Sequence, residues 1–127
     1  MTTYNETSTD HGPPSRAETA SLCRGAATLI RQRGWDPLAE SWSPVGPLPM
    51  DVAIFSVAEN RGYEHLDDLL DVVLTHIAGT LYAIGDVTQQ MLIHDLTDVA
   101  MAWEARPGRA ADEVLATLDL TASILGR

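Results

Sequence analysis

The stretch YEHLDDLLDVVLTHIAGTLYAI, residues 63–84, decides the fold of this chain of 127 residues. Its apolar side chains recur every three or four residues, which is the spacing of one face of an α-helix. No segment of the chain alternates strictly between apolar and polar residues, the pattern of a half-buried β-strand. We therefore expect an all-α protein. The apolar stripe consists of Leu66, Leu69, Leu70, Val73, Leu74, Ile77 and Leu81.

The segment before this stretch carries clear signals for a helix over residues 16–33. Ser15 and Glu18 stand three residues apart, as in a capping box, in which each side chain accepts a hydrogen bond from the other residue's backbone. Gly34 is the residue type that commonly follows the last turn of a helix. The sequence therefore predicts both ends of the first helix.

Further helices are predicted on either side of the central stretch. One covers about residues 50–61. Another starts at Asp86, with Gln89 in the capping-box position, and can divide near His94. The last starts near Arg109.

Between the first two helices lies a segment in which regular structure is unlikely. Residues 34–49 contain four prolines together with Trp35 and Trp42, and proline lacks the amide proton that helices and sheets need. We predict a compact bundle of about five helices with a Pro/Trp-rich loop between helices 1 and 2. Residues 1–14 are predicted to form a flexible N-terminal tail, and residues 15–127 a single helical domain.

The charge of the chain restricts its partners. The formal net charge is −10, and there are twelve acidic residues but only one arginine, Arg61, between residues 36 and 104. Because nucleic acids and anionic membranes are bound through Lys and Arg, we expect neither as a direct partner. A basic or Arg-rich protein surface remains as a partner, and solubility alone is the other explanation.

The chain also lacks signs of secretion or of membrane insertion. Its first residues are polar, without the basic and apolar regions of a signal peptide. The only cysteine, Cys23, suits a reducing compartment. We expect a cytoplasmic protein.

An acidic cluster at the start of the central stretch is the candidate binding site. Its members stand at positions i, i+3, i+4 and i+7, so on a helix they would share one face. A solvated face, a contact with a basic partner and a cation site are the three interpretations. The histidines and Cys23 lack zinc-ligand spacing, so we predict no metal site. With Trp35 and Trp42, the candidate binding residues are Glu64, Asp67, Asp68 and Asp71.

We expect a small binding or regulatory protein that acts through protein–protein contacts. The alternative is a small cofactor-independent enzyme of the cyclase or isomerase type in bacterial specialised metabolism, with a pocket under the Pro/Trp-rich loop. No phosphate-binding or nucleotide-binding motif is present, so no cofactor is predicted. Buried carboxylates of such an enzyme would need raised pKa values to act near neutral pH. Its candidate catalytic residues are Asp36, Glu40, Asp51 and His94.

The C-terminal stretch DVAMAWEARPGRAADEVL, residues 98–115, resembles a small family of actinobacterial and phage proteins of unknown function. The shared signature is a Trp, then Pro-Gly-Arg, then Glu-Val-Leu at the start of a last helix. Residues 29–35, LIRQRGW, are similar to the end of the first helix in that family. Glu104-Ala105 stands where the family often has Asn-Asp, and Ala110 where it often has a Thr cap. The resemblance implies a bacterial, cytoplasmic, helical protein and no known reaction.

Overall fold

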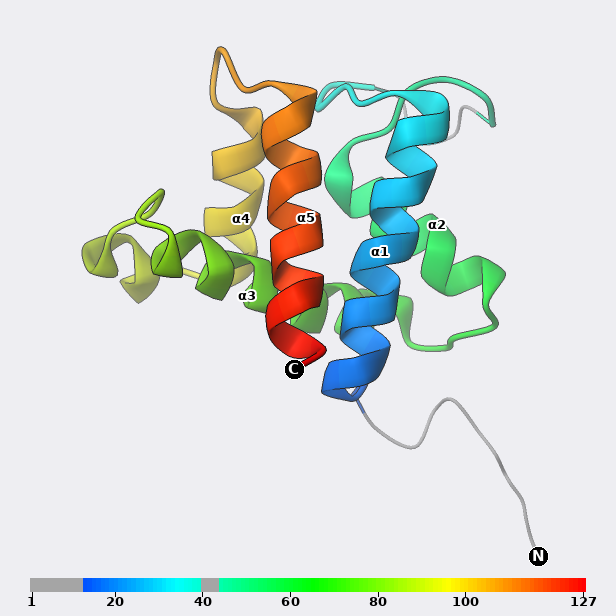
Figure 1. Ribbon diagram of the computed structural model, residues 1–127, viewed down its shortest axis with the longest axis horizontal. Coiled ribbons are helices and arrows are strands. Elements are labelled where there is room, and N and C mark those ends of the chain that lie inside the picture. Colours follow the sequence, from blue (N-terminus) through cyan, green and yellow to red (C-terminus); the bar gives the residue numbers. More distant parts are fainter. Residues whose placement is uncertain (1–12, 40–43) are drawn as a thin grey trace, which may run out of the picture.

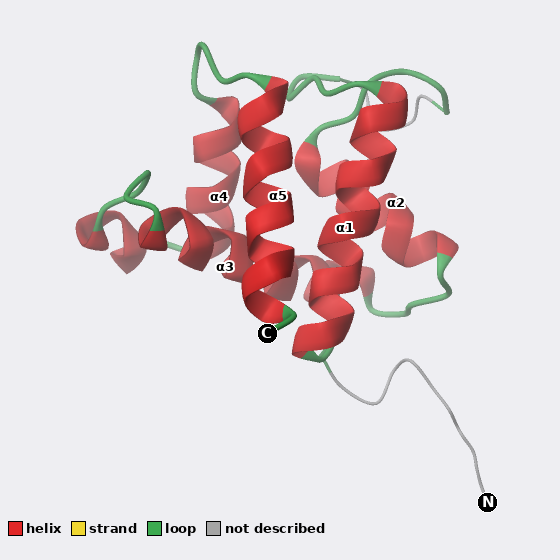
Figure 2. Cartoon of the chain, viewed as in Figure 1, coloured by secondary structure: helices red, strands yellow, loops and turns green. Residues whose placement is uncertain are grey.

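The computed structural model describes residues 13–39 and 44–127, and this part of the chain forms helices without a β-strand (Figure 2). The prediction of an all-α bundle of about five helices is confirmed. The described elements are α1 (Arg16–Arg33), α2 (Met50–Asn60), α3 (Leu66–Ala83), the short 3-10 helix η2 (Gln89–Ile93), α4 (Leu96–Ala105) and α5 (Ala111–Leu125).

The first and last helices lie side by side at the centre of the bundle (Figure 1). α2 packs against the other side of α1, while α3 runs crosswise and contacts α2, α4 and α5 (Figure 1). At the lower end of Figure 1, Nη2 of Arg16 donates a hydrogen bond of 3.2 Å to the carbonyl of Ile124. The two ends of the helical domain therefore meet.

The apolar stripe on α3 is buried as the sequence predicts, with Val73, Leu74, Ile77 and Leu81 at most 1% exposed. Gly79 does not interrupt this helix, which runs unbroken through it. No helix in the described ranges is long and apolar enough to cross a lipid bilayer.

α1 begins and ends where its local signals place it. The amide of Glu18 donates to Oγ of Ser15, and the amide of Ser15 donates to Oε1 of Glu18, at 3.1 and 2.8 Å. Gly34 follows the helix with a φ of 95°, a conformation that glycine adopts without steric cost. Local contacts therefore mark both ends of α1.

α3 is shorter than the helical stretch predicted over residues 63–84. Residues 63–65 connect α2 to α3 instead of forming the first turn of the helix. The amide of Tyr63 donates to the carbonyl of Ala58, and its hydroxyl donates to Oε2 of Glu18 at 3.0 Å. His65 then takes a left-handed conformation with a φ of 53°. These contacts with α1 and α2 hold the connection out of the helix.

The predicted capping role of Asp86 is wrong. Its Oδ2 accepts a hydrogen bond of 3.3 Å from Nε1 of Trp103 instead. Thr88 caps η2, and Asp95 caps α4 through the amide of Thr97 at 2.9 Å. The expected division of this segment near His94 is confirmed, because His94 follows the last residue of η2.

The described ends of the loop after α1 are held together by backbone hydrogen bonds. The amide of Leu48 donates to the carbonyl of Gly34 at 3.0 Å, and the amide of Asp36 donates to the carbonyl of Leu48 at 3.2 Å. This pairing places Trp35 beside the first turn of α2. Residues 1–12, in the predicted tail, and Glu40 and Trp42, in the predicted loop, lie outside the described residues.

Candidate functional site

The acidic segment, defined here as Glu64, Asp67, Asp68 and Asp71, spans the start of α3. All four side chains are exposed. Asp67 and Asp68 lie in the first turn of the helix, where the helix dipole favours negative charge. Because α3 begins at Leu66, Glu64 precedes the helix, and the predicted single helical face is formed only by the three aspartates.

The acidic segment has little internal neutralisation. Within the described residues the two ion pairs join Arg31 to Asp119 and Arg109 to Glu113, so neither includes a member of the segment. Asp71 accepts a hydrogen bond of 3.4 Å from Oγ1 of Thr97 on α4. In the described ranges, no group of three or more His, Cys, Asp or Glu residues is arranged to hold a metal ion.

A second cluster of polar groups lies at the first turn of α2. Glu104, on α4, is only 1% exposed. Its Oε2 accepts hydrogen bonds from Nε1 of Trp35 at 2.7 Å and from the amide of Met50 at 2.5 Å. The residue before α2 is Pro49, which has no side-chain group to cap the helix. Glu104 therefore supplies the cap for α2 from another helix.

Glu104 was not among the predicted site residues, although the sequence contains a signal for it. The apolar stripe of α4 includes Leu96, Ala100 and Trp103. Glu104 stands four residues after Ala100, so it falls on the buried side of the helix. A charged residue at an apolar position is rarely buried without a partner, and its position predicts a buried carboxylate.

The environment of this cluster changes the protonation of two carboxyls. Burial raises the pKa of Glu104, the hydrogen bonds from Trp35 and Met50 lower it in part, and the nearby charge of Asp51 raises it further. Burial also raises the pKa of Asp51, against the opposing effect of backbone hydrogen bonds. Oδ1 of Asp51 is buried and has no hydrogen-bond partner within the described residues. The two carboxyls therefore hold protons more strongly than exposed ones.

The other candidate catalytic residues do not join this cluster. Oδ1 of Asp36 accepts a hydrogen bond of 2.9 Å from the amide of Leu38, so it shapes the loop. His94 is exposed and precedes α4, while Glu104 is near the last residue of that helix. Ten residues of helix separate such positions by about 15 Å. Of the three candidates within the described residues, only Asp51 lies close enough for its charge to act on Glu104. Glu40 lies outside the described residues.

The residues of the C-terminal signature build the turn between α4 and α5. The guanidinium carbon of Arg109 lies 4.0 Å from the ring centre of Trp103, and Nε of Arg109 donates to the carbonyl of Trp103 at 2.9 Å. Nη1 of Arg109 also donates to Glu113 at 3.0 Å, and Glu113 accepts the amide of Ala110 at 2.9 Å. Gly108 has a φ of 86° in the turn. The signature residues therefore have a structural role, because they hold the turn between α4 and α5 together.

Two further titratable side chains, Cys23 and His76, lie outside the cluster at Glu104. Cys23 is fully buried, and burial raises the pKa of its thiol to about 12. His76 lines a hollow of about 230 Å³ between α3 and α5, where burial and the charge of Arg16 lower its pKa. A thiol that keeps its proton is a poor nucleophile.

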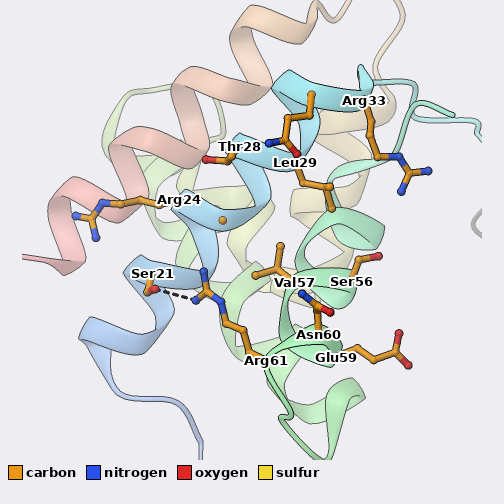
Figure 3. A pocket seen from close by; sticks show the side chains of 12 residues that line it. Ser21, Arg24, Thr28, Leu29, Arg33, Ser56, Val57, Glu59, Asn60 and Arg61 are labelled. Atoms are coloured by element: carbon orange, nitrogen blue, oxygen red, sulfur yellow. Dashed lines mark hydrogen bonds between the residues drawn. The ribbon is translucent and has the colours of Figure 1, made fainter. Parts of the chain in front are cut away.

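A larger hollow is an open groove of about 840 Å³ between α1 and α2 (Figure 3). Its lining includes three arginines, which are Arg24, Arg33 and Arg61. Neither this groove nor the hollow at His76 is lined by Trp35, Asp51 or Glu104.

These observations define a small all-α domain with a charged surface and a buried carboxylate at a helix end. Residues 14–124 match the model of a family of unknown function (DUF6197), and the chain belongs to that family. No curated protein matched the chain. The search of solved structures gave no match either.

Proposed function

We propose that this protein is a small cytoplasmic binding or regulatory module that acts through protein–protein contacts. Its contact surface is the acidic segment, and its partner presents a basic or Arg-rich surface. The signature around Trp103 and Arg109 supports an origin among actinobacteria and their phages by resemblance.

One observation carries the proposal: the four carboxylates of the acidic segment are exposed, and none is in an ion pair within the described residues. Like charges on one helix face repel by a few tenths of a kcal/mol per pair, in the range of about 0.2–0.5 kcal/mol. A basic partner relieves that repulsion, and opposite charges raise the rate of encounter.

The candidate tryptophans do not extend this surface. Trp35 is half-buried and bound to Glu104 at the first turn of α2, while the acidic segment follows the last turn of α2. The eleven residues of α2 span about 16 Å. Trp35 therefore lies at the other end of α2 from the acidic segment, and Trp42 lies outside the described residues.

The alternative function, a small cofactor-independent enzyme, is favoured by the unpartnered Oδ1 of Asp51 beside Glu104. An enzyme would need a hollow in which these groups converge on a substrate. The two hollows described above are lined by other residues of the described ranges.

The test is an affinity capture from actinobacterial lysate with three baits. The baits are the wild type, the triple variant Asp67→Asn/Asp68→Asn/Asp71→Asn, and a control that removes the same charge elsewhere. The control is Glu59→Gln/Asp98→Asn/Asp112→Asn, because all three of its residues are exposed and two of them lie in the first turn of a helix.

We expect a basic protein that both the wild type and the control retain and that the Asp67/Asp68/Asp71 variant loses. Circular dichroism checks that all three baits are folded. A basic partner that binds equally well to all three baits, or no basic partner at all, contradicts the proposal.

A further inference from the structure

The groove between α1 and α2 is the most prominent feature that the acidic segment does not use (Figure 3). The two helices approach closely at Gly25, which is one of its lining residues. A Cβ atom added at Gly25 of α1 would lie 2.8 Å from Nη2 of Arg61 and from Cγ1 of Val57.

The groove is basic in an acidic protein. Three of the eight arginines line it, against one acidic residue, Glu59. The guanidinium of Arg24 points away toward α5, where it donates to the carbonyl of Ala122 (Figure 3), so Arg33 and Arg61 supply the positive charge of the groove. At physiological salt, charges farther away than about 8 Å are largely screened. A ligand inside the groove therefore experiences mainly the local positive charge and little of the net charge of −10.

Its arginines are held at two separate places. Nη1 of Arg61 donates a hydrogen bond of 2.8 Å to Oγ of Ser21, which ties the side chain across the groove at one end (Figure 3). Nε of Arg33 donates to the carbonyl of Gly46 at 2.8 Å near the other end. A guanidinium that is already held loses less conformational freedom on binding.

The shape suits an extended chain. Ser21 and Arg33 are twelve residues apart on α1, which corresponds to about 18 Å, and an extended peptide of five or six residues covers about that length. Leu29 and Val57 are half-buried and provide apolar contact between the ends. The lining also includes hydroxyl and amide side chains that can bind peptide groups, namely Thr28, Gln32, Ser56 and Asn60.

We propose that this groove binds an acidic, extended peptide segment of a partner protein, with carboxylates of the peptide at Arg33 and Arg61. We choose an acidic peptide as the ligand because its charge is opposite to that of the groove. Carboxylates pair with guanidinium groups through two parallel hydrogen bonds. The groove is separate from the acidic segment and opposite in charge, so this inference does not depend on the proposed function.

The probe is a fluorescein-labelled hexapeptide with two glutamates at each end and two valines in the middle, measured by fluorescence anisotropy. The charge variant is Arg33→Gln/Arg61→Gln. The matched control is Arg16→Gln/Arg31→Gln, which removes two arginines of α1 that do not line the groove. A third variant, Thr28→Trp, fills the groove without changing its charge, because Thr28 is an exposed lining residue.

We expect the wild type and the Arg16/Arg31 control to bind the peptide equally. The Arg33/Arg61 variant and the Thr28 variant should each bind at least about tenfold more weakly, since hydrogen bonds between charged groups and contact area are lost. A peptide with lysines in place of the glutamates should not bind.

Three results would overturn the inference. In the first, the folded wild type does not bind the peptide up to about 1 mM, a concentration at which even weak contacts are detected. In the second, all variants bind the peptide equally. In the third, the lysine peptide binds as well as the glutamate peptide. Sedimentation of the wild type and the Arg33/Arg61 variant tests the other occupant, the acidic segment of a second copy. Self-association through the groove without peptide binding also counts against a partner peptide.

Discussion

Glu104 has a structural role that its neighbours on α4 do not share. Its carboxylate is buried and accepts hydrogen bonds from Trp35 and from the backbone of Met50. A carboxyl whose pKa is raised in the folded state binds protons more tightly there than in the unfolded chain. Its contribution to stability is complete below its ordinary pKa of 4.5 and is lost as pH rises through the raised value.

We therefore expect Glu104→Gln to reduce the pH dependence of stability above pH 4.5. The amide oxygen of glutamine can accept both hydrogen bonds but does not ionise. The free energy of unfolding, measured by urea titration at several pH values, should favour the variant increasingly as pH rises. The difference between the two proteins cancels the opposite contribution of His76, whose pKa is lowered.

Glu104→Ala is the control for this experiment. It leaves Nε1 of Trp35 and the amide of Met50 without their acceptor, which should cost about 2–4 kcal/mol. A glutamine variant with the same pH dependence as the wild type, or an alanine variant as stable as the glutamine variant, would show that Glu104 does not act in this way.

The sequence predicted part of the site at the level of single residues. The spacing of Asp67, Asp68 and Asp71 was enough to predict an exposed acidic face, because neighbours on one helix are set by the period of that helix. The role of Glu104 was not predictable in the same way. It depends on the first turn of α2, which only the tertiary fold brings to α4.

At the level of elements, the turn between α4 and α5 depends on the side chain of Arg109. This side chain is 8% exposed, stacks on Trp103, binds the carbonyl of that residue and pairs with Glu113. A lysine keeps the charge but loses the planar group and the Nε–H donor. The turn should therefore distinguish between the two cations.

We expect Arg109→Lys to lower the free energy of unfolding by about 1–3 kcal/mol. Arg106→Lys is the matched control, because Arg106 is in the same turn and is exposed, and it should change stability by less than about 0.5 kcal/mol. Chemical denaturation of both variants measures the two values. Equal values for the two variants would mean that the stacked arrangement contributes nothing specific.

Element boundaries were predictable where the signals are local. Ser15, Glu18 and Gly34 determine both ends of α1 through contacts within a few residues. The start of α3 was not predictable, since Tyr63 is held by Glu18 on a distant helix. Asp86 is a similar case, because its carboxylate binds Trp103 instead of capping a helix.

At the scale of the whole molecule, charge works against the compact state. The net charge is −10, and the described residues contain two ion pairs. Self-repulsion of this kind destabilises a folded chain and is weakened by salt. Burial of the apolar helix faces has to outweigh it.

We expect the melting temperature to rise when NaCl is increased from about 20 mM to about 300 mM, because the Debye length falls over this range. The rise should be smaller for Asp67→Asn/Asp68→Asn/Asp71→Asn, which removes three charges from one helix. Differential scanning fluorimetry measures both. A melting temperature that falls with NaCl would indicate that attractive ion pairs outweigh the repulsion.

The packing partners of the helices were the part of the fold that the sequence left open. A helical period identifies the buried face of an element but not the element that covers it. The pairing of α1 with α5, the first and last helices, joins residues as distant in sequence as Arg16 and Ile124. Such contacts arise from the assembled bundle.

The meeting of the first turn of α1 with the last turn of α5 has a consequence for the modular use of this domain. A unit whose two ends are adjacent can be inserted into a surface loop of a host protein with little distortion of either. The described ends of the Pro/Trp-rich loop and the turn between α4 and α5 lie at the opposite end of the bundle (Figure 1). A host attached at α1 and α5 would leave that end accessible.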